Sequence, residues 1–412
     1  MIYIESQTLS GCRVSHSLRG SYGVRIETTM LSQEQLTSSH ECERAWIEID
    51  LAALAANTRS LRQWLAPTTE LLAVVKADAY GHGALTVAQT VLAHGATWLG
   101  VATIPEGIAL RQAGITAPIL VLGSVNLPVQ VQMMAQWQLQ PTLSTPKQAL
   151  IFSDYADRLR EPLDVHLMID TGMSRLGCPW QDAVGFVQFV QRLPHLRIQG
   201  IYSHFASADD PDASLMRQQQ AYFEQVWEQI SALGLGPVRR HMANSAATLA
   251  NRSSHYDMVR IGLSLYGVYP ASHLRGVVPL RPVMQVRSRI TLLKEIPAGT
   301  GISYGHQFIA PQPMKIAVVG IGYADGVPRL LSNKLEVLVQ GKRLRQVGAI
   351  TMDQLMIDVS DMDGLQEGDV VTLLGEDGGD CLTVETWAEA LGTITWEILC
   401  GFKNRLPRIP VS

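Results

Sequence analysis

The chain has 412 residues, of which 47% are hydrophobic and 17% are charged, and its formal net charge is -4. These values are typical of a globular protein with ample core, and the length suggests two or three domains. The slight negative charge, without a long basic run, argues against a nucleic-acid or anionic-membrane partner. No apolar run approaches the roughly 20 residues that span a bilayer. The five scattered cysteines lack metal-ligand spacing and fit a reducing compartment, so we expect a cytoplasmic protein without a metal site.

Residues 1–44 differ from the rest of the chain. They are polar, rich in Ser and Thr, and contain no apolar segment of signal-peptide length. We interpret them as a disordered extension, and Met30 is an alternative start that would shorten it.

Residues 45–275 alternate between strand-like and helix-like patterns. A first strand is expected at 45–50 and a helix at 51–65. Eight apolar strands then alternate with helices, at 71–76, 98–103, 118–123, 140–145, 164–170, 197–205, 239–245 and 257–262. Such strands form parallel sheets, and eight units predict a closed (β/α)8 TIM-type barrel. An open doubly wound sheet is the alternative, but no Gly-x-Gly-x-x-Gly follows the first strand.

Residues 276–412 show a different pattern. Short alternating strands bounded by turn residues are expected at 284–293, 315–321, 335–339, 355–359 and 369–374. A helix is expected at 383–391, because Thr383 can cap its start and Gly392 its end. This part of the chain is predicted to be a mostly antiparallel β domain, and strand 45–50 could join either domain.

Polar residues gather where the barrel strands end. The carboxyl ends of the strands form the face on which barrel enzymes carry their catalytic groups. A lysine half-buried there would have a pKa below its usual value of about 10.4, which suits Schiff-base formation, although a lone lysine can also merely extend toward solvent. The residues on this face are Lys76, Arg175, His204, Asn244, Ser245, Arg260, Gly262 and Leu263.

The loops after the seventh and eighth strands are suited to hold an anion. Phosphate commonly binds at this place in barrels. Ser245 offers a hydroxyl, Gly262 and Leu263 offer backbone N–H groups, and Tyr80 can add a phenolic donor. Alternatively, Ser245 only caps the helix that follows it.

The segment Val74-Val-Lys-Ala-Asp-Ala-Tyr-Gly-His-Gly83 resembles the pyridoxal-phosphate attachment segment of alanine racemases, and the resemblance covers roughly residues 45–410. It implies a barrel followed by a β domain, a homodimer arranged head to tail, and racemisation of L- and D-alanine that supplies D-alanine for peptidoglycan. It also implies that the cofactor is held by Lys76, Tyr80, His204, Asn244, Ser245, Arg260, Gly262 and Leu263.

Arg260 is expected to decide the type of reaction. Many pyridoxal-phosphate enzymes place a carboxylate at the pyridine nitrogen, whereas arginine stays protonated and can only donate. With a guanidinium there, return of the proton to Cα is favoured over transamination. The alternative for Arg260 is a structural salt bridge with Asp257.

Racemisation needs a base on each face of the substrate. Lys76 is one, and Tyr304, in Gly301-Ile-Ser-Tyr-Gly-His306, matches the family's second base. A cationic environment at His204 and Arg260 would make the tyrosine a better base. The resemblance also implies that Arg175 binds the substrate carboxylate, and that Tyr323, Met352 and Asp353 reach the substrate from the partner subunit.

Two positions depart from the family pattern. Met168 stands where many members have a lysine, so Arg175 lacks that support and weaker substrate binding is expected. Asn404 stands where some members have a tyrosine that contacts the phosphate. Three other functions remain open at this point: racemisation of serine or another small amino acid, a pyridoxal-phosphate decarboxylase of the same architecture, and a cofactor-storing protein.

Overall fold

The computed structural model describes residues 43–402 and 404–411. The predicted extension and the alternative start Met30 lie outside the described residues, except for positions 43 and 44. Arg44 is part of the folded structure, since its guanidinium pairs with the carboxylate of Asp325 at 2.6 Å. Among the described residues, no helix combines the length and the apolar character needed to cross a membrane.

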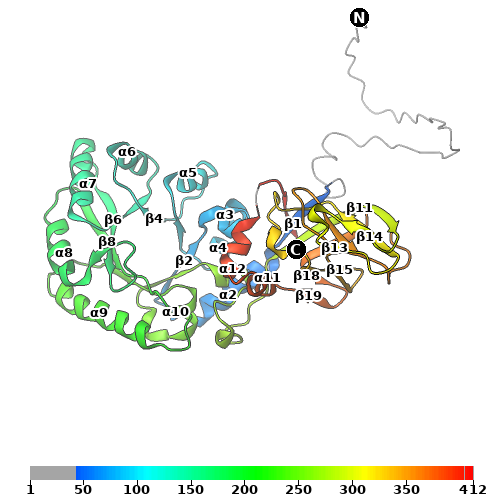
Figure 1. Ribbon diagram of the computed structural model, residues 1–412. Coiled ribbons are helices and arrows are strands. Elements are labelled where there is room, and N and C mark those ends of the chain that lie inside the picture. The colour runs from blue at the N-terminus through cyan, green and yellow to red at the C-terminus, as the bar shows by residue number, and fades with distance from the viewer. Residues whose placement is uncertain (1–42, 403, 412) are drawn as a thin grey trace, which may run out of the picture. The chain divides into compact units, whose positions relative to one another are not determined.

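Eight parallel strands form a closed barrel, as predicted (Figure 1). Each strand pairs with its neighbours in the order β5-β4-β3-β2-β10-β9-β8-β6, and pairing of β5 with β6 closes the ring. The strands are β2 (Glu70–Val74), β3 (Trp98–Val101), β4 (Ile119–Ser124), β5 (Gln140–Leu143), β6 (Leu163–Asp170), β8 (Leu196–Tyr202), β9 (Arg239–His241) and β10 (Met258–Ile261). A short strand, β7 (Cys178–Pro179), extends the sheet beside β6.

Helices lie around the outside of the strands (Figure 1). They are α2 (Leu51–Trp64), α4 (Ala84–Ala93), α5 (Ile104–Gln112), α6 (Pro128–Gln136), α7 (Pro146–Leu159), α8 (Ala183–Gln191), α9 (Ser214–Ser231) and α10 (Ser245–Ala250). Helix α2 shows why these segments form where they do. Asp50 caps its first turn by accepting a hydrogen bond from Ala53 N at 2.7 Å, and Leu54 and Leu61 on its inner face are fully buried.

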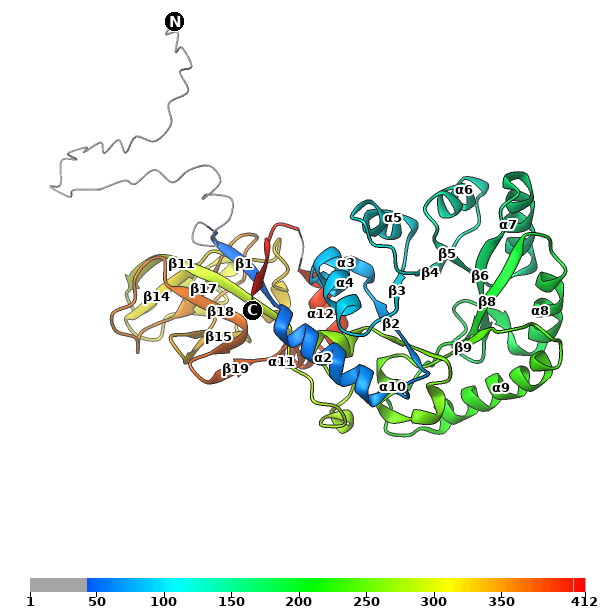
Figure 2. The same cartoon turned by 180° about the vertical axis from the view of Figure 1, so that it is seen from behind.

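The second sheet is mostly antiparallel and has the order β16-β15-β18-β11-β1-β20 (Figure 2). Its strands are β1 (Ala45–Asp50), β11 (Met284–Ile296), β14 (Met314–Val319), β15 (Glu336–Val339), β16 (Lys342–Arg345), β17 (Leu355–Asp358), β18 (Val370–Asp377), β19 (Asp380–Leu382) and β20 (Arg408–Val411). The first strand of the chain, β1, lies in this sheet, antiparallel to β11 and parallel to β20. Strands β12 (Gly301–Ile302) and β13 (Phe308–Ile309) form a separate hairpin.

Two helices follow the second sheet. Helix α11 (Val384–Leu391) begins after Thr383, whose side chain accepts from Thr386 N, and ends at Gly392 with a φ of 65°. Helix α12 (Thr395–Gly401) packs against α3 (Lys76–Gly81), the segment that follows the first barrel strand. The approach is close, because a Cβ at Gly81 would lie 2.6 Å from the carbonyl oxygen of Leu399. The carboxyl-terminal segment therefore supports the turn that carries Lys76.

Candidate active site

Lys76 lies at the carboxyl end of the first barrel strand but not within it. Strand β2 ends at Val74, two residues before the predicted end. Val75 still donates to Gly100 O at 2.8 Å, and Lys76 then begins α3. Val75 already leaves strand geometry, with φ -114° and ψ 17°, and the backbone enters the left-handed region at Ala77. Burial and the nearby Arg175 lower the pKa of the Lys76 amine, which favours its neutral, nucleophilic form.

Four consecutive residues after Lys76 have left-handed backbone angles. The φ values run from 53° to 55° across Ala77, Asp78, Ala79 and Tyr80, and none of these residues is glycine. Each such residue costs roughly 1–2 kcal/mol in an L-amino-acid chain, so the turn must be held by its surroundings. This turn fixes the direction in which both Lys76 and Tyr80 leave the backbone.

Glu106, which the sequence analysis missed, is one of the groups that hold the turn. Its carboxylate accepts from Ala77 N at 2.7 Å and, with its other oxygen, from Ala102 N at 2.7 Å and Thr103 N at 3.0 Å. The spacing of Thr103 and Glu106 is a capping-box signal that marks the start of α5. That signal predicts the cap but not the contact with the neighbouring turn.

Three residues predicted to hold an anion, Ser245, Gly262 and Tyr80, lie close to one another. The Ser245 hydroxyl accepts from Gly262 N at 3.0 Å, and a Cβ on Gly262 would lie 2.6 Å from the Tyr80 hydroxyl oxygen. Burial raises the pKa of Tyr80, so the phenol keeps its proton and can donate. The helix cap is Asn244, which accepts from Ala247 N at 3.0 Å, so the alternative role for Ser245 is wrong. Leu263 follows Gly262 and is buried.

The guanidinium of Arg260 is buried and donates only to neutral acceptors. It donates to Ser203 O at 2.8 Å, to His204 Nδ1 at 2.9 Å and to His241 Nδ1 at 3.0 Å. The proposed salt bridge with Asp257 does not form, because that carboxylate accepts from Arg240 N and lies 3.6 Å from the Arg240 side chain. Arg260 therefore carries a positive charge with no carboxylate partner among the described residues.

The hydrogen bonds behind Arg260 fix the tautomers of two buried histidines. Because arginine can only donate, His241 Nδ1 must accept and its proton must sit on Nε2. That proton is donated to His166 Nδ1 at 3.0 Å, and His166 Nε2 in turn donates to Gln140 Oε1 at 2.9 Å. Gly200 leaves room for this pair, since a Cβ there would overlap the His166 ring. This series of hydrogen bonds from Arg260 to Gln140 thus forms only when both imidazoles are neutral.

Burial, with nearby Arg260, keeps the histidines of this face uncharged. It lowers the pKa of His166 and of His204 to about 3 and that of His241 well below its usual value. Burial also lowers the pKa of His82, in the turn after Lys76, to about 4. His204 therefore supplies no imidazolium, and the cationic character expected around it comes from Arg260.

The lowered pKa values of these buried histidines predict that the protein loses stability on mild acidification. The unfolded chain binds protons on them near pH 6.5, whereas the folded chain does not until about pH 4, so lowering the pH favours unfolding. The free energy of unfolding should be greatest above about pH 6.5 and fall by about 1.4 kcal/mol per pH unit for each imidazole. Urea unfolding at a series of pH values between 7.5 and 5 measures this slope. Replacing exposed His273 by glutamine should leave the slope unchanged, and a flat profile would contradict the prediction.

The residues predicted to meet the substrate from the second domain form a separate group. Tyr304, Tyr323 and Met352 are 70%, 42% and 52% exposed. Tyr323 N donates to Thr351 O at 2.9 Å, which sets its loop beside Met352, and Asp353 accepts from Arg405 at 2.7 Å. Tyr304 lines a hollow of about 880 Å³ whose walls are all formed by residues of the second domain. Lys76 is not among the described residues that line this hollow.

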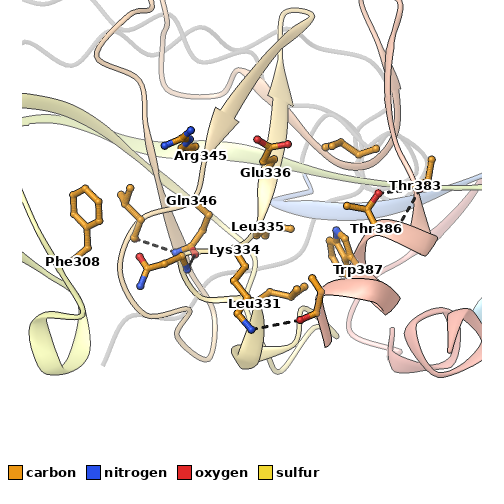
Figure 3. A pocket seen from close by; sticks show the side chains of 14 residues that line it. Phe308, Leu331, Lys334, Leu335, Glu336, Arg345, Gln346, Thr383, Thr386 and Trp387 are labelled. Atoms are coloured by element: carbon orange, nitrogen blue, oxygen red, sulfur yellow. Dashed lines mark hydrogen bonds between the residues drawn. The ribbon is translucent and has the colours of Figure 1, made fainter. Parts of the chain in front are cut away.

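Another cavity, of about 280 Å³, lies between α11 and strands β15 and β16 (Figure 3). Phe308 and Trp387 line it, and none of the predicted site residues does. Its buried amide, Gln346, already donates to Val347 O at 3.0 Å and to Gly348 O at 2.8 Å. The cavity therefore offers no free buried polar group, and the candidate site remains at the mouth of the barrel.

The structure leaves Arg175 and Asn404 exposed and buries Met168. Arg175 is exposed in the loop after β6, which Asp170 shapes by accepting from Gly172 N, Met173 N and Ser174 N at 2.9–3.1 Å. Met168 is buried within β6. Asn404 is exposed in the turn before β20. No hydrogen bond or ion pair is made by the Arg175 side chain within the described part of the chain, so its guanidinium is available to an anion.

Comparison with known proteins shows that both domains of the chain resemble those of alanine racemases. The family model for the N-terminal domain of alanine racemase matches residues 49–270, and that for the C-terminal domain matches residues 283–410. The chain is 61% identical over 371 residues to alanine racemase from Nostoc sp., covering 90% of this chain and 96% of that protein. It is 57% identical over 367 residues to the Synechocystis enzyme, covering 89% and 99%.

Solved structures show the same likeness. Alanine racemase from Clostridium difficile superposes with a TM-score of 0.86 at 34% identity, covering 90% of this chain and 96% of that chain. The Bacillus anthracis enzyme with bound L-Ala-P superposes with a TM-score of 0.84 at 35% identity, covering 90% and 95%.

Proposed function

The chain belongs to the alanine racemase family, and we propose that it interconverts L- and D-alanine with pyridoxal phosphate as cofactor. The observation that supports this most directly is the half-buried Lys76, with a lowered amine pKa, on the barrel face that also carries an anion cradle and an unneutralised arginine. We place the activity in the cytoplasm, where it would supply D-alanine for peptidoglycan.

The residues of the barrel mouth fit this cofactor. The Ser245 hydroxyl, the Tyr80 phenol and the backbone of Gly262 and Leu263 converge where a phosphate would be held, and the missing side chain of Gly262 leaves the necessary space. Asn244 caps the helix that begins at Ser245, so its amide positions the cradle. Lys76 would hold the aldehyde end, and Arg260, with His204 beside it, would face the ring.

The reaction moves one proton on and off the substrate Cα. When bound, pyridoxal phosphate delocalises the charge left on Cα after that proton is removed. Lys76 would remove or return the proton on one face and Tyr304 on the other, and Arg175 would hold the substrate carboxylate. Arg260 keeps its proton and can only donate hydrogen bonds, so it would not act as the acid partner that favours transamination.

We further propose that the active unit is a homodimer with shared sites. Lys76 lies in the barrel, whereas Tyr304, Tyr323, Met352 and Asp353 lie in the second domain and form a largely exposed group. A second copy arranged head to tail would set this exposed group over the barrel mouth and complete both sites. The exposure of Tyr304 in one chain is what supports this arrangement.

The function is tested by spectrum, trapping and conversion. The purified protein should show the yellow absorbance of lysine-bound pyridoxal phosphate, and borohydride should fix the cofactor on the peptide that contains Lys76. L-alanine should be converted to D-alanine, and a panel of L-amino acids in deuterium oxide should separate alanine from serine as the substrate. The Lys76→Ala variant should lose colour and activity, whereas exposed Lys147→Ala should keep both. Carbon dioxide release, or a colourless protein without conversion, would contradict the proposal.

A further inference from the structure

His82 ends the left-handed turn that begins after Lys76, and its ring is 1% exposed. Its Nδ1 lies 2.9 Å from Ala79 O and 3.0 Å from Tyr80 O. Carbonyl oxygens only accept hydrogen bonds, so the ring must carry its proton on Nδ1 and donate it to both. One N–H group thus joins the carbonyls of two adjacent left-handed residues.

The other ring nitrogen shows that this tautomer is the one the site allows. His82 Nε2 is buried and has no hydrogen-bond partner among the described residues. The ring stacks on Tyr266, with centroids 4.4 Å apart and planes 23° apart. A proton on Nε2 would be buried without an acceptor, which is unfavourable. The ring is therefore held as a neutral donor that points back at the turn.

The turn itself is clamped at both ends. At its start, Ala77 N donates to Glu106 at 2.7 Å, and Tyr266 donates to Val74 O at 2.8 Å. At its end, the Tyr80 hydroxyl lies so close to Gly262 that no side chain fits there. Between these ends, the His82 side chain donates to the carbonyls of Ala79 and Tyr80, and Arg408 donates to the carbonyl of Gly81 at 3.0 Å. A small rotation of those peptide groups would move the Tyr80 hydroxyl out of the anion cradle.

We propose that His82 is a positioning residue whose Nδ1–H bond to the carbonyls of Ala79 and Tyr80 sets the spacing between the Lys76 amine and the Tyr80 hydroxyl. Both groups are assigned to the cofactor, one to its aldehyde and one to its phosphate, so the inference rests on the proposed function. The expected consequence of losing this bond is weaker binding of pyridoxal phosphate.

Two substitutions with the same amide group separate positioning from packing. The amide nitrogen of asparagine occupies nearly the place of imidazole Nδ1, whereas that of glutamine reaches one bond further, toward Nε2. His82→Asn should therefore keep the donor to both carbonyls, and His82→Gln should lose it. After removal of the cofactor, titration with pyridoxal phosphate should give a dissociation constant for His82→Asn within about threefold of the unsubstituted protein. For His82→Gln it should be at least about tenfold weaker, and its yellow absorbance band should be shifted or weakened.

A control and the contrary outcomes complete this test. His94 donates to Thr90 O at 2.7 Å at the end of α4, so His94→Gln removes a similar bond away from the turn and should leave cofactor affinity unchanged. Equal affinities for the Asn and Gln variants of His82 would overturn the inference. If the unsubstituted protein bound no pyridoxal phosphate, the proposed function itself would fail instead.

One measurement does not depend on any variant folding. Nitrogen-15 NMR of histidine in the unsubstituted protein should show the Nδ1–H tautomer for His82 at about pH 7, with no imidazolium down to about pH 6. Finding the Nε2–H tautomer would exclude the bond to the two carbonyls and overturn the inference.

Discussion

Mixing a Lys76→Ala protein with a Tyr304→Phe protein is expected to restore activity that neither has alone. Each variant should lose at least about a hundredfold in kcat, because each lacks one of the two groups assigned to proton transfer. In a dimer that contains one chain of each kind, one site carries both substitutions and the other carries neither. If the sites are shared and the chains exchange at random, half of the dimers are mixed, so about a quarter of the original activity returns.

The measurement is the rate of L-to-D conversion after the two inactive proteins are unfolded together and refolded. The matched control mixes Lys76→Ala with Arg260→Glu, both of which alter the barrel. Every site in those mixed dimers carries one substitution, so no activity should return. No recovery in the first mixture despite dimer formation would show that each chain builds its site alone. Recovery in the control would show that Lys76 and Arg260 of one site come from different chains, which would also contradict the proposed arrangement.

Replacing Arg260 by glutamate should lower racemisation and release pyruvate. Arg260 donates to four neutral acceptors and cannot give up a proton, whereas a buried glutamic acid can. Loss of a buried donor of this kind lowers kcat by roughly 10²–10³-fold, and part of the remaining turnover should end as transamination.

The variant also disturbs the histidines behind the site. His241 Nδ1 would lose its donor and could move its proton there, which breaks the chain through His166 to Gln140. Pyruvate formed per alanine racemised is the quantity to measure, and Arg260→Lys, which keeps a charged donor, is the control. Full racemase turnover with glutamate at this position would contradict the role given to Arg260.

The barrel could be predicted because its strands are buried on both faces and therefore appear as unbroken apolar runs, such as Leu71 to Val75. The left-handed turn could not be predicted, since Ala77, Asp78, Ala79 and Tyr80 carry no local signal for positive φ. Its geometry is imposed by groups distant in the chain, such as Glu106.

The site was only partly accessible to sequence reasoning. Residues that act at strand ends, such as Lys76 and Arg260, can be found from the alternation of strands and helices. The partners that fix their state cannot, because His166 and His241 are separated by 75 residues and look like ordinary core positions. The assignment of Tyr304 depended on family resemblance, since an exposed tyrosine in a turn has no distinguishing pattern.

The position of β1 affects how the chain folds during its synthesis. β1 lies between β11 and β20, and β20 is formed by nearly the last residues of the chain. At an elongation rate of about 5–20 residues per second, β1 leaves the ribosome tens of seconds before β20 exists. The edge of β1 that pairs with β20 must keep its backbone N–H and C=O groups unpaired for that time. A nascent chain stalled before Arg408 would therefore expose this edge, which makes it a natural target for chaperone binding.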